Sequence, residues 1–180
     1  MPGNLTIEEL ILRLELVTKE FMTFCTSITG EIFFRQPVEK WSIAQNVNHL
    51  TTSANMTKLV YRLPAFFIRI YSGKPNRPSR TYDELVSKYK SKLELGGRAS
   101  GRFIAKPVSP AIGKDKVLQI FSTSMSSLIA VIKSKWNDVL LDNYLAPHPL
   151  LGKITLRELC YFTIYHTEHH LSIIKERLND

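Results

Sequence analysis

The chain has 180 residues, of which 44% are hydrophobic and 22% charged, and it carries a formal net charge of +8 and two cysteines. This composition is typical of a globular domain, and it excludes wholesale disorder, collagen-like or coiled-coil classes and a framework of disulfides. The length is sufficient for one hydrophobic core and short for two, so we expect one domain over residues 1–180.

The first predicted element is an amphipathic helix that starts after residue 6. Apolar residues recur at three-and-four spacing from Ile7 to Ile28, and Thr6 with Glu9 has the form of a capping box. Gly30 is expected to mark the end of this helix. Four glutamates within residues 8–20 argue against a secretory signal and a membrane span, so we expect a cytoplasmic protein that does not enter a membrane.

A second helix is predicted to start at Ser42, which forms a capping box with Gln45. Apolar side chains from residue 43 to residue 61 share one side of this helix, which also contains His49. Pro64 is expected to end or kink the helix, because proline lacks the backbone N–H that a helix interior needs. The apolar run at residues 66–70 indicates that the helix resumes beyond this point.

The middle of the chain combines irregular segments with a short charged helix. Residues 72–80 and 96–114 are rich in Gly, Pro and Ser, whereas residues 81–94 show a helical pattern. Because loops carry much of the binding chemistry of proteins, we expect both irregular segments to shape the mouth of a functional site.

Positive charge is concentrated in the same region. The segment from Lys58 to Lys116 contains 14 of the 24 basic residues but only four acidic ones. Such a segment could face nucleic acid or an anionic substrate. We favour a solvated surface and expect no nucleic-acid partner, because the segment has no recognition helix, arginine-rich motif or alternation of aromatic and basic residues.

Two further long helices are predicted in the last third of the chain. One starts near Asp115 and ends before residue 142, and the other starts at a capping box of Thr155 and Glu158 and ends near Leu178. The buried positions expected on the former are Val117, Ile120, Phe121, Leu128, Ile132 and Trp136. No segment alternates clearly as a half-buried strand would. The predicted fold class is all-α, a four-helix bundle with a short extra helix and long loops.

The two cysteines, Cys25 and Cys160, lie in apolar helical patterns. A thiol in such a pattern is most often a small buried hydrophobe, whereas a nucleophilic thiol needs an electropositive and partly open environment. We therefore expect neither cysteine to take part in the chemistry of the protein.

The sequence YHTEHHL at residues 165–171 places three of the five histidines on the last predicted helix. His166 and His170 fall on the same stripe as the apolar residues, so both are expected to point inward, with Cβ atoms roughly 6 Å apart. This spacing allows two imidazoles to bind one ion at the ~2.1 Å distances that zinc prefers. His169 lies about 100° around the helix and is expected at the rim.

Two interpretations of this inward pair are open on the residues alone. One is a metal site, and the other is a core pair whose imidazoles bond to Tyr161, Tyr165 or water. His49 could supply a third ligand if its helix lies beside the last one, or it could be a polar residue at a helix–helix seam. Glu168 follows His166 by two positions instead of one, so the zinc-protease motif is not matched and Glu168 is expected in solvent or at an interface.

Three segments together resemble the DinB/YfiT-like family of small four-helix-bundle proteins. They are WSIAQNVNHL at residues 41–50, HPLLGKITLREL at residues 148–159 and the closing YHTEHHL motif. The resemblance covers most of the chain in order. It implies a metal site formed by His49, His166 and His170, which would hold a divalent ion such as zinc or nickel and leave positions open for water or substrate.

The resemblance also implies two chemistries on a small-molecule substrate, namely transfer of a low-molecular-weight thiol and metal-assisted hydrolysis. In either case the ion would lower the pKa of the bound nucleophile. Gln45, one turn before His49, is a candidate for a contact to a ligand histidine or to substrate, and Tyr165 and His169 are further candidates. The family resemblance implies a homodimer as well.

The chain departs from the family pattern after the histidine pair, where many relatives carry a glutamine and this chain has Ile173. His148, between two prolines, matches a loop position of the family and is interpreted as structural. Two alternatives to a metal-dependent enzyme stay open. One is a stress-response or binding module with weakly held or no metal, and the other, which we favour least, is a DNA-binding protein.

Overall fold

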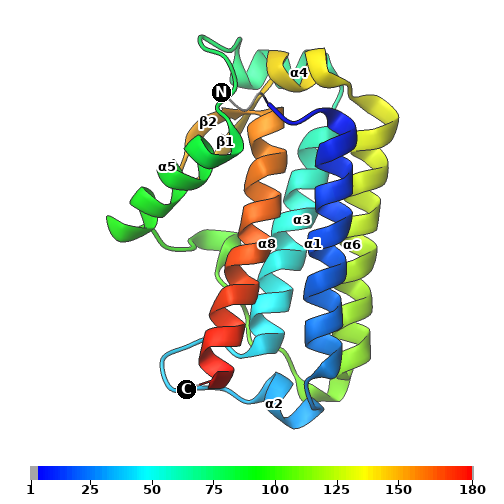
Figure 1. The fold of residues 1–180 in the computed structure, drawn as a ribbon, viewed down its shortest axis with the longest axis vertical. Helices are drawn as coiled ribbons and strands as arrows, with labels where there is room; N and C mark the ends of the chain where they lie inside the picture. Colours follow the sequence, from blue (N-terminus) through cyan, green and yellow to red (C-terminus); the bar gives the residue numbers. More distant parts are fainter. Residues whose placement is uncertain (1–3, 180) are drawn as a thin grey trace.

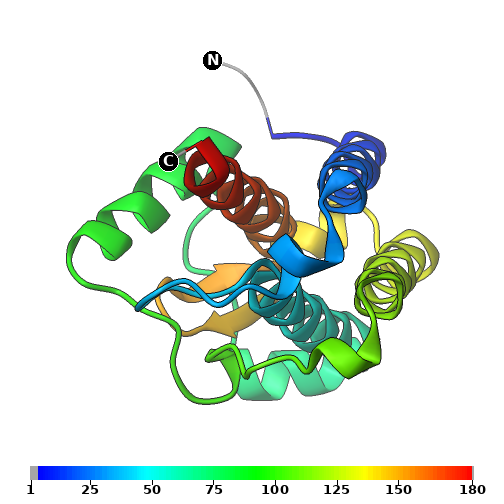
Figure 2. The same ribbon diagram turned by 90° about the horizontal axis from the view of Figure 1, so that it is seen from below.

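The computed structural model describes residues 4–179, and its main feature is a bundle of four long helices (Figure 1). These helices are α1 (Ile7–Ser27), α3 (Ile43–Arg62), α6 (Lys114–Lys135) and α8 (Leu156–Asn179). Helix α1 packs against α6 and α8, and α3 packs against the same two helices. Seen end-on, the four therefore form a square in which α1 lies diagonally opposite α3 (Figure 2). The predicted all-α fold class is confirmed.

Shorter elements connect and flank the bundle. The short helices are α2 (Gly30–Phe34), α4 (Ala65–Ser72), α5 (Tyr82–Glu94) and α7 (Asp138–Asn143), together with the 3₁₀ turns η1 (Gly101–Phe103) and η2 (Pro110–Ile112). Strands β1 (Leu145–His148) and β2 (Gly152–Thr155) form an antiparallel hairpin in which Leu145 pairs with Thr155 and His148 with Gly152. Helix α5 and this hairpin lie beside α8, on the side away from α1 (Figure 1).

The helix starts follow the predicted caps. The predicted capping boxes of α1 and α3 are both present, with Thr6 and Ser42 as the N-cap residues. At the start of α8, the Thr155 N–H donates to Glu158 over 2.9 Å and the Glu158 N–H donates to the Thr155 hydroxyl over 3.2 Å. Each pair satisfies backbone donors that a helix terminus otherwise leaves without partners.

Several local expectations are wrong. Gly30 does not end the first helix, because α1 stops at Ser27 and Gly30 begins α2, which is capped by the Thr29 hydroxyl. Helix α7 and the hairpin were not expected either. On α6, Ile120 was expected in the core but is 39% exposed. At Pro64 the expectation is confirmed, since α3 ends at Arg62 and α4 resumes at residue 65.

Helix α6 is the one helix within residues 4–179 that is long and apolar enough to cross a membrane. Core helices of globular domains have the same composition, and α6 packs against both α1 and α3. Its Phe121 ring lies 5.1 Å from the ring of Phe21 on α1, and both side chains are fully buried. The apolar character of α6 is therefore accounted for by the bundle core.

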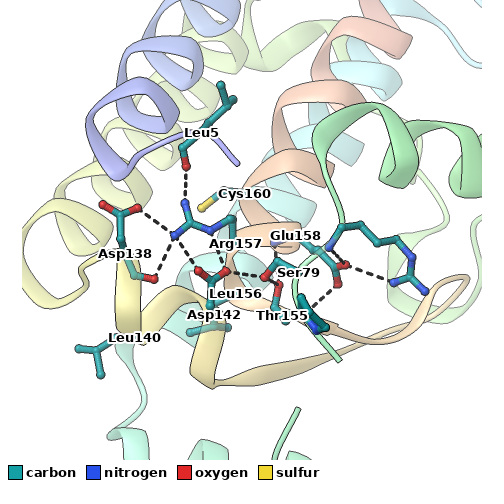
Figure 3. A network of polar contacts seen from close by, with 12 residues as sticks. Leu5, Ser79, Asp138, Leu140, Asp142, Thr155, Leu156, Arg157, Glu158 and Cys160 are labelled. Atoms are coloured by element: carbon teal, nitrogen blue, oxygen red, sulfur yellow. Dashed lines mark hydrogen bonds and ion pairs between the residues drawn. The ribbon is translucent and has the colours of Figure 1, made fainter. Parts of the chain in front are cut away.

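The first turn of α8 is held by a network of charged side chains (Figure 3). The buried carboxylate of Glu158 accepts two hydrogen bonds from the Arg77 guanidinium, at 2.7 and 2.9 Å, and one from the Arg80 backbone N–H at 2.8 Å. The adjacent Arg157 donates to Asp138 and Asp142. This network fastens the segment at residues 72–80 and helix α7 to the start of α8.

Candidate metal centre

Three histidines from two helices meet in the interior of the bundle. His166 and His170 lie one turn apart on the inward face of α8, and His49 faces them from α3. The Nε2 atom of His166 lies 3.0 Å from Nε2 of His49 and 3.2 Å from Nε2 of His170. The potential ligand atoms of the three residues all lie within 4.8 Å of one another, and all three side chains are buried. The residues predicted as a metal triad are thus brought together.

The hydrogen bonds behind two of the rings determine where their protons lie. The Asn46 amide nitrogen donates to the Ser42 carbonyl over 2.8 Å, so the Asn46 amide oxygen faces His170 Nδ1, 2.7 Å away, as an acceptor. His49 Nδ1 lies 2.7 Å from the Phe103 carbonyl, which can only accept. Both Nδ1 atoms therefore carry hydrogen, and the Nε2 atoms of neutral His49 and His170 present lone pairs.

This proton arrangement fits a metal ion. Of the three converging Nε2 atoms, only that of His166 can carry a proton. It faces the Nε2 lone pairs of His49 and His170. Burial, followed by the neighbouring histidines, lowers the pKa of both His166 and His170 well below the usual value, so an added proton is disfavoured. A divalent ion binds unprotonated imidazole nitrogens and would satisfy all three.

Aromatic rings pack against the histidines. The Trp41 ring is parallel to His170 within 2°, at a centroid distance of 6.3 Å. Phe162 stacks on His166 at 4.7 Å with an interplanar angle of 23°. Together with the Nδ1 hydrogen bonds, these contacts restrict the rotation of the imidazoles and pre-organise the converging nitrogens.

A cavity of about 760 Å³ opens on one side of the three histidines. It is lined by α3, α5 and α8, by residues of the segment 97–103, and by the tip of the hairpin. The expectation that the segment 96–114 shapes the site is therefore confirmed for its first part, because residues within 97–103 line the cavity and residues 104–114 do not. The same expectation for residues 72–80 is wrong, because none of them lines the cavity and the network around Glu158 holds that segment at the start of α8.

The other candidates for contacts at the site take different positions. His169 lines the cavity and stacks on Tyr165 at 5.8 Å, whereas Tyr165 itself is not among the lining residues. Gln45 does not line the cavity either, because its side chain closes the capping box of α3 and donates to the Ala105 carbonyl. The contact to a ligand histidine comes from the neighbouring Asn46, which the sequence reasoning missed.

Glu168 and His148 have the structural roles expected for them. Glu168 is exposed and accepts a hydrogen bond of 2.6 Å from the Tyr82 hydroxyl. His148 Nδ1 accepts from the backbone N–H groups of Leu150 and Leu151, at 3.2 Å each, and so shapes the hairpin turn. Burial lowers the pKa of His148 to about 4, so this ring is neutral near pH 7 although it also lines the cavity.

Both cysteines are buried away from the cavity. Burial raises the pKa of the Cys25 thiol and of the Cys160 thiol to about 12. The Cys160 sulfur lies 2.9 Å from the Tyr61 hydroxyl inside the core. Neither thiol belongs to the residues that line the cavity, as expected for small buried hydrophobes.

A family model described as the DinB superfamily matches residues 13–174, which is most of the chain and includes all three converging histidines. No curated protein matches the chain.

Proposed function

The chain belongs to the DinB superfamily, and on this premise we propose that it is a metal-dependent transferase that joins an external low-molecular-weight thiol to a small electrophile. His49, His166 and His170 would hold one divalent ion, with zinc or nickel as the candidates. The observation that carries this proposal is the convergence of three buried Nε2 atoms, two of which have their proton fixed on the opposite ring nitrogen.

A catalytic role is favoured over a structural one by the number of ligands. Structural zinc sites are usually closed by four protein ligands, whereas catalytic sites have three and leave a position open. The cluster offers three nitrogens among the described residues, and the cavity lies directly beside them. Reactants could therefore reach the open position from the cavity.

Thiol transfer is favoured over hydrolysis by the chemistry of the cavity wall. The described lining contains no aspartate or glutamate. Hydrolytic metal sites commonly use a carboxylate as the general base for water, as in the zinc-protease motif. A bound divalent ion supplies Lewis-acid chemistry that lowers the pKa of a thiol, whose ordinary value of about 8.5 is already far below that of water. A thiol thus needs no carboxylate to be a nucleophile near neutral pH.

The side chains of the protein would position the reactants. Asn46 and the Phe103 carbonyl hold His170 and His49 with their Nε2 atoms toward the cavity, and Trp41 packs beside both rings. In the proposed reaction the thiol releases its proton to water, its sulfur forms a bond to carbon of the electrophile, and the leaving group departs with the electron pair of the broken carbon–leaving-group bond. The thiol comes from outside the chain, because Cys25 and Cys160 do not line the cavity.

Metal content and turnover test two separate parts of the proposal. Protein purified without chelators would be analysed for metals as wild type, as His166→Ala and as His169→Ala, the last being a histidine on the same helix outside the cluster. We expect about one equivalent of metal in wild type and His169→Ala and a large loss in His166→Ala. Equal metal content in all three would exclude the triad.

Turnover would be followed with a panel of thiols and the chromogenic electrophile 1-chloro-2,4-dinitrobenzene. We expect a rate that depends on bound metal and disappears in His166→Ala. If metal is bound but no thiol reacts with any electrophile tested, a non-catalytic metal-binding module would replace the transferase proposal.

A further inference from the structure

Three arginines line the cavity that holds the histidine cluster: Arg98, Arg102 and Arg177. No carboxylate is found among the described lining residues. We infer that this cavity takes an organic carboxylate with an apolar body, bound through these guanidinium groups. As the substrate class of the transferase, this inference rests on the proposed function, although the binding of such an anion can be measured without metal or turnover.

Three arginines outside the cavity have acidic partners that neutralise their charge. Arg77 and Arg80 bind Glu158, and Arg157 binds Asp138 and Asp142. By contrast, no carboxylate of the described residues lies within 4.0 Å of the guanidinium groups that line the cavity.

The contacts of the three cavity arginines are to neutral groups and leave N–H donors free. Arg98 donates from Nη1 to the carbonyls of Leu93 and Gly97, at 3.3 and 2.9 Å. The Arg102 Nη1 atom contacts the Met56 sulfur at 3.6 Å, and Arg177 Nη1 donates to the Trp41 carbonyl over 3.2 Å. A guanidinium has five N–H donors, so each of these groups retains donors that can bind a carboxylate.

Arg177 places positive charge next to the metal centre. Its side chain is half-buried, and its charge is among the causes, after burial, that lower the pKa of His170. A divalent ion on the histidines would add to the same positive field, and the lining offers no negative charge to offset it. An anionic reactant would neutralise this field, whereas a cationic one would be repelled.

The remaining wall of the cavity suits an apolar body. Met56 and Val60 of α3, Leu93 of α5 and Leu150 of the hairpin turn contribute aliphatic surface, and the volume of about 760 Å³ lies within the usual range for small-molecule sites. Arg98 and Arg102 are exposed at the mouth. A ligand with an apolar body could therefore pack against this wall while its carboxylate binds an arginine.

Tryptophan fluorescence provides a direct binding test. Trp41 lines the cavity, whereas Trp136 is buried and donates to the Tyr61 carbonyl. The probes would be 4-nitrobenzoate and 4-nitrobenzamide, which have nearly the same shape and quench tryptophan on contact, but only the benzoate is charged. We expect saturable quenching of metal-free wild type, with a Kd about tenfold lower for the benzoate, because hydrogen bonds to charged groups are the stronger ones.

Two sets of variants identify the charges that cause the preference for 4-nitrobenzoate. The combined variant Arg98→Gln, Arg102→Gln, Arg177→Gln should bind both probes equally. A control with the same change in net charge, Lys19→Gln, Arg62→Gln, Lys133→Gln, alters exposed residues that do not line the cavity and should keep the preference. If the triple cavity variant does not fold, the pair Arg98→Gln, Arg102→Gln should still reduce the preference, since both side chains are exposed.

The outcomes separate this inference from the proposed function. A preference for the benzoate in metal-free protein that is lost in the cavity variant supports the inference, whatever the metal content of the protein. Equal Kd values in wild type, no saturable quenching by either probe, or a preference that persists in the cavity variant would overturn it. Failure of the metal triad would instead appear as equal metal content in wild type and His166→Ala.

Discussion

Asn46 accepts a hydrogen bond from His170, with its amide oxygen 2.7 Å from the imidazole Nδ1 atom. The amide cannot be reversed without losing its own bond to the Ser42 carbonyl. Asn46 therefore selects the tautomer of His170 whose Nε2 lone pair faces the cluster. A residue in the first turn of α3 thus determines where the proton of a histidine on α8 lies. Contacts of this kind orient ligands and raise their basicity.

The change Asn46→Ala should weaken metal binding by about 10–100-fold, the usual effect of removing such a partner. The measurement is a competition titration of zinc against a chromogenic chelator. Asn55→Ala, a half-buried asparagine farther along the same helix, is the matched control and should leave the affinity unchanged. The same zinc affinity in Asn46→Ala and wild type would show that Asn46 does not orient the ligand.

The buried histidines should make the metal-free protein less stable in acid. Burial is the main cause that lowers the pKa of His49, His166 and His170. The unfolded chain protonates these imidazoles below about pH 6.5 while the folded protein keeps them neutral, so the unfolded state binds more protons there. The free energy of unfolding should therefore be fully retained above about pH 6.5 and fall as the pH decreases from this value toward the lowered pKa values.

Urea unfolding of metal-free protein at several pH values below about 6.5 measures this effect. The slope of unfolding free energy against pH should be shallower in His166→Phe, by up to about 1.4 kcal/mol per pH unit for the histidine removed. Tyr165→Phe, on the same helix, removes no group that titrates in this range and should keep the wild-type slope. Identical slopes for His166→Phe and wild type would refute the assignment of a buried neutral imidazole.

The cysteines should be unreactive in the folded protein. Because burial raises the pKa of both thiols to about 12, the thiolate that reacts with alkylating reagents is scarce near neutral pH. Iodoacetamide should modify Cys25 and Cys160 at least about a hundredfold more slowly in native protein than in urea, as followed by mass spectrometry. Rapid alkylation of native protein, with loss of turnover, would instead point to a thiol supplied by the chain itself.

Removing the carboxylate of Glu158 should destabilise the fold. Burial alone would raise the pKa of Glu158, but hydrogen bonds from Arg77, Arg80 and Thr155 hold it below its usual value. Glu158→Gln should lower the free energy of unfolding by about 3 kcal/mol, because a buried ion pair loses one partner. Glu94→Gln, an exposed carboxylate at the end of α5, is the control and should change the unfolding midpoint little.

The long helices could be predicted because their signals are local. A capping box and a three-and-four stripe specify the start and the buried face of α1, α3 and α8 within the segment itself. The hairpin gave no such signal, since strands of four residues are held by pairing across the turn, and β1 contains Pro147. The prediction that Gly30 ends the first helix is wrong. Glycine often follows a helix, whereas here Gly30 begins a new helix that the Thr29 hydroxyl caps.

Helix periodicity predicts which histidines share the buried face of α8. It does not predict which of two neighbouring residues contacts a ligand histidine. His166 and His170 share the buried stripe of α8, and this could be inferred from their spacing. Gln45 and Asn46 both lie about one turn before His49, so spacing did not separate them. The capping box had already assigned the Gln45 side chain to the Ser42 backbone, which leaves Asn46 as the residue free to bond to a histidine.

The location of bound metal tests the central claim most directly. An anomalous difference map from crystals of protein purified without chelators, recorded at the absorption edge of the metal found in it, should show one strong peak. We predict that this peak lies about 2.1 Å from the Nε2 atoms of His49, His166 and His170, with its open side toward the cavity. A map without a peak at this position, or a metal held by other residues, would contradict the account.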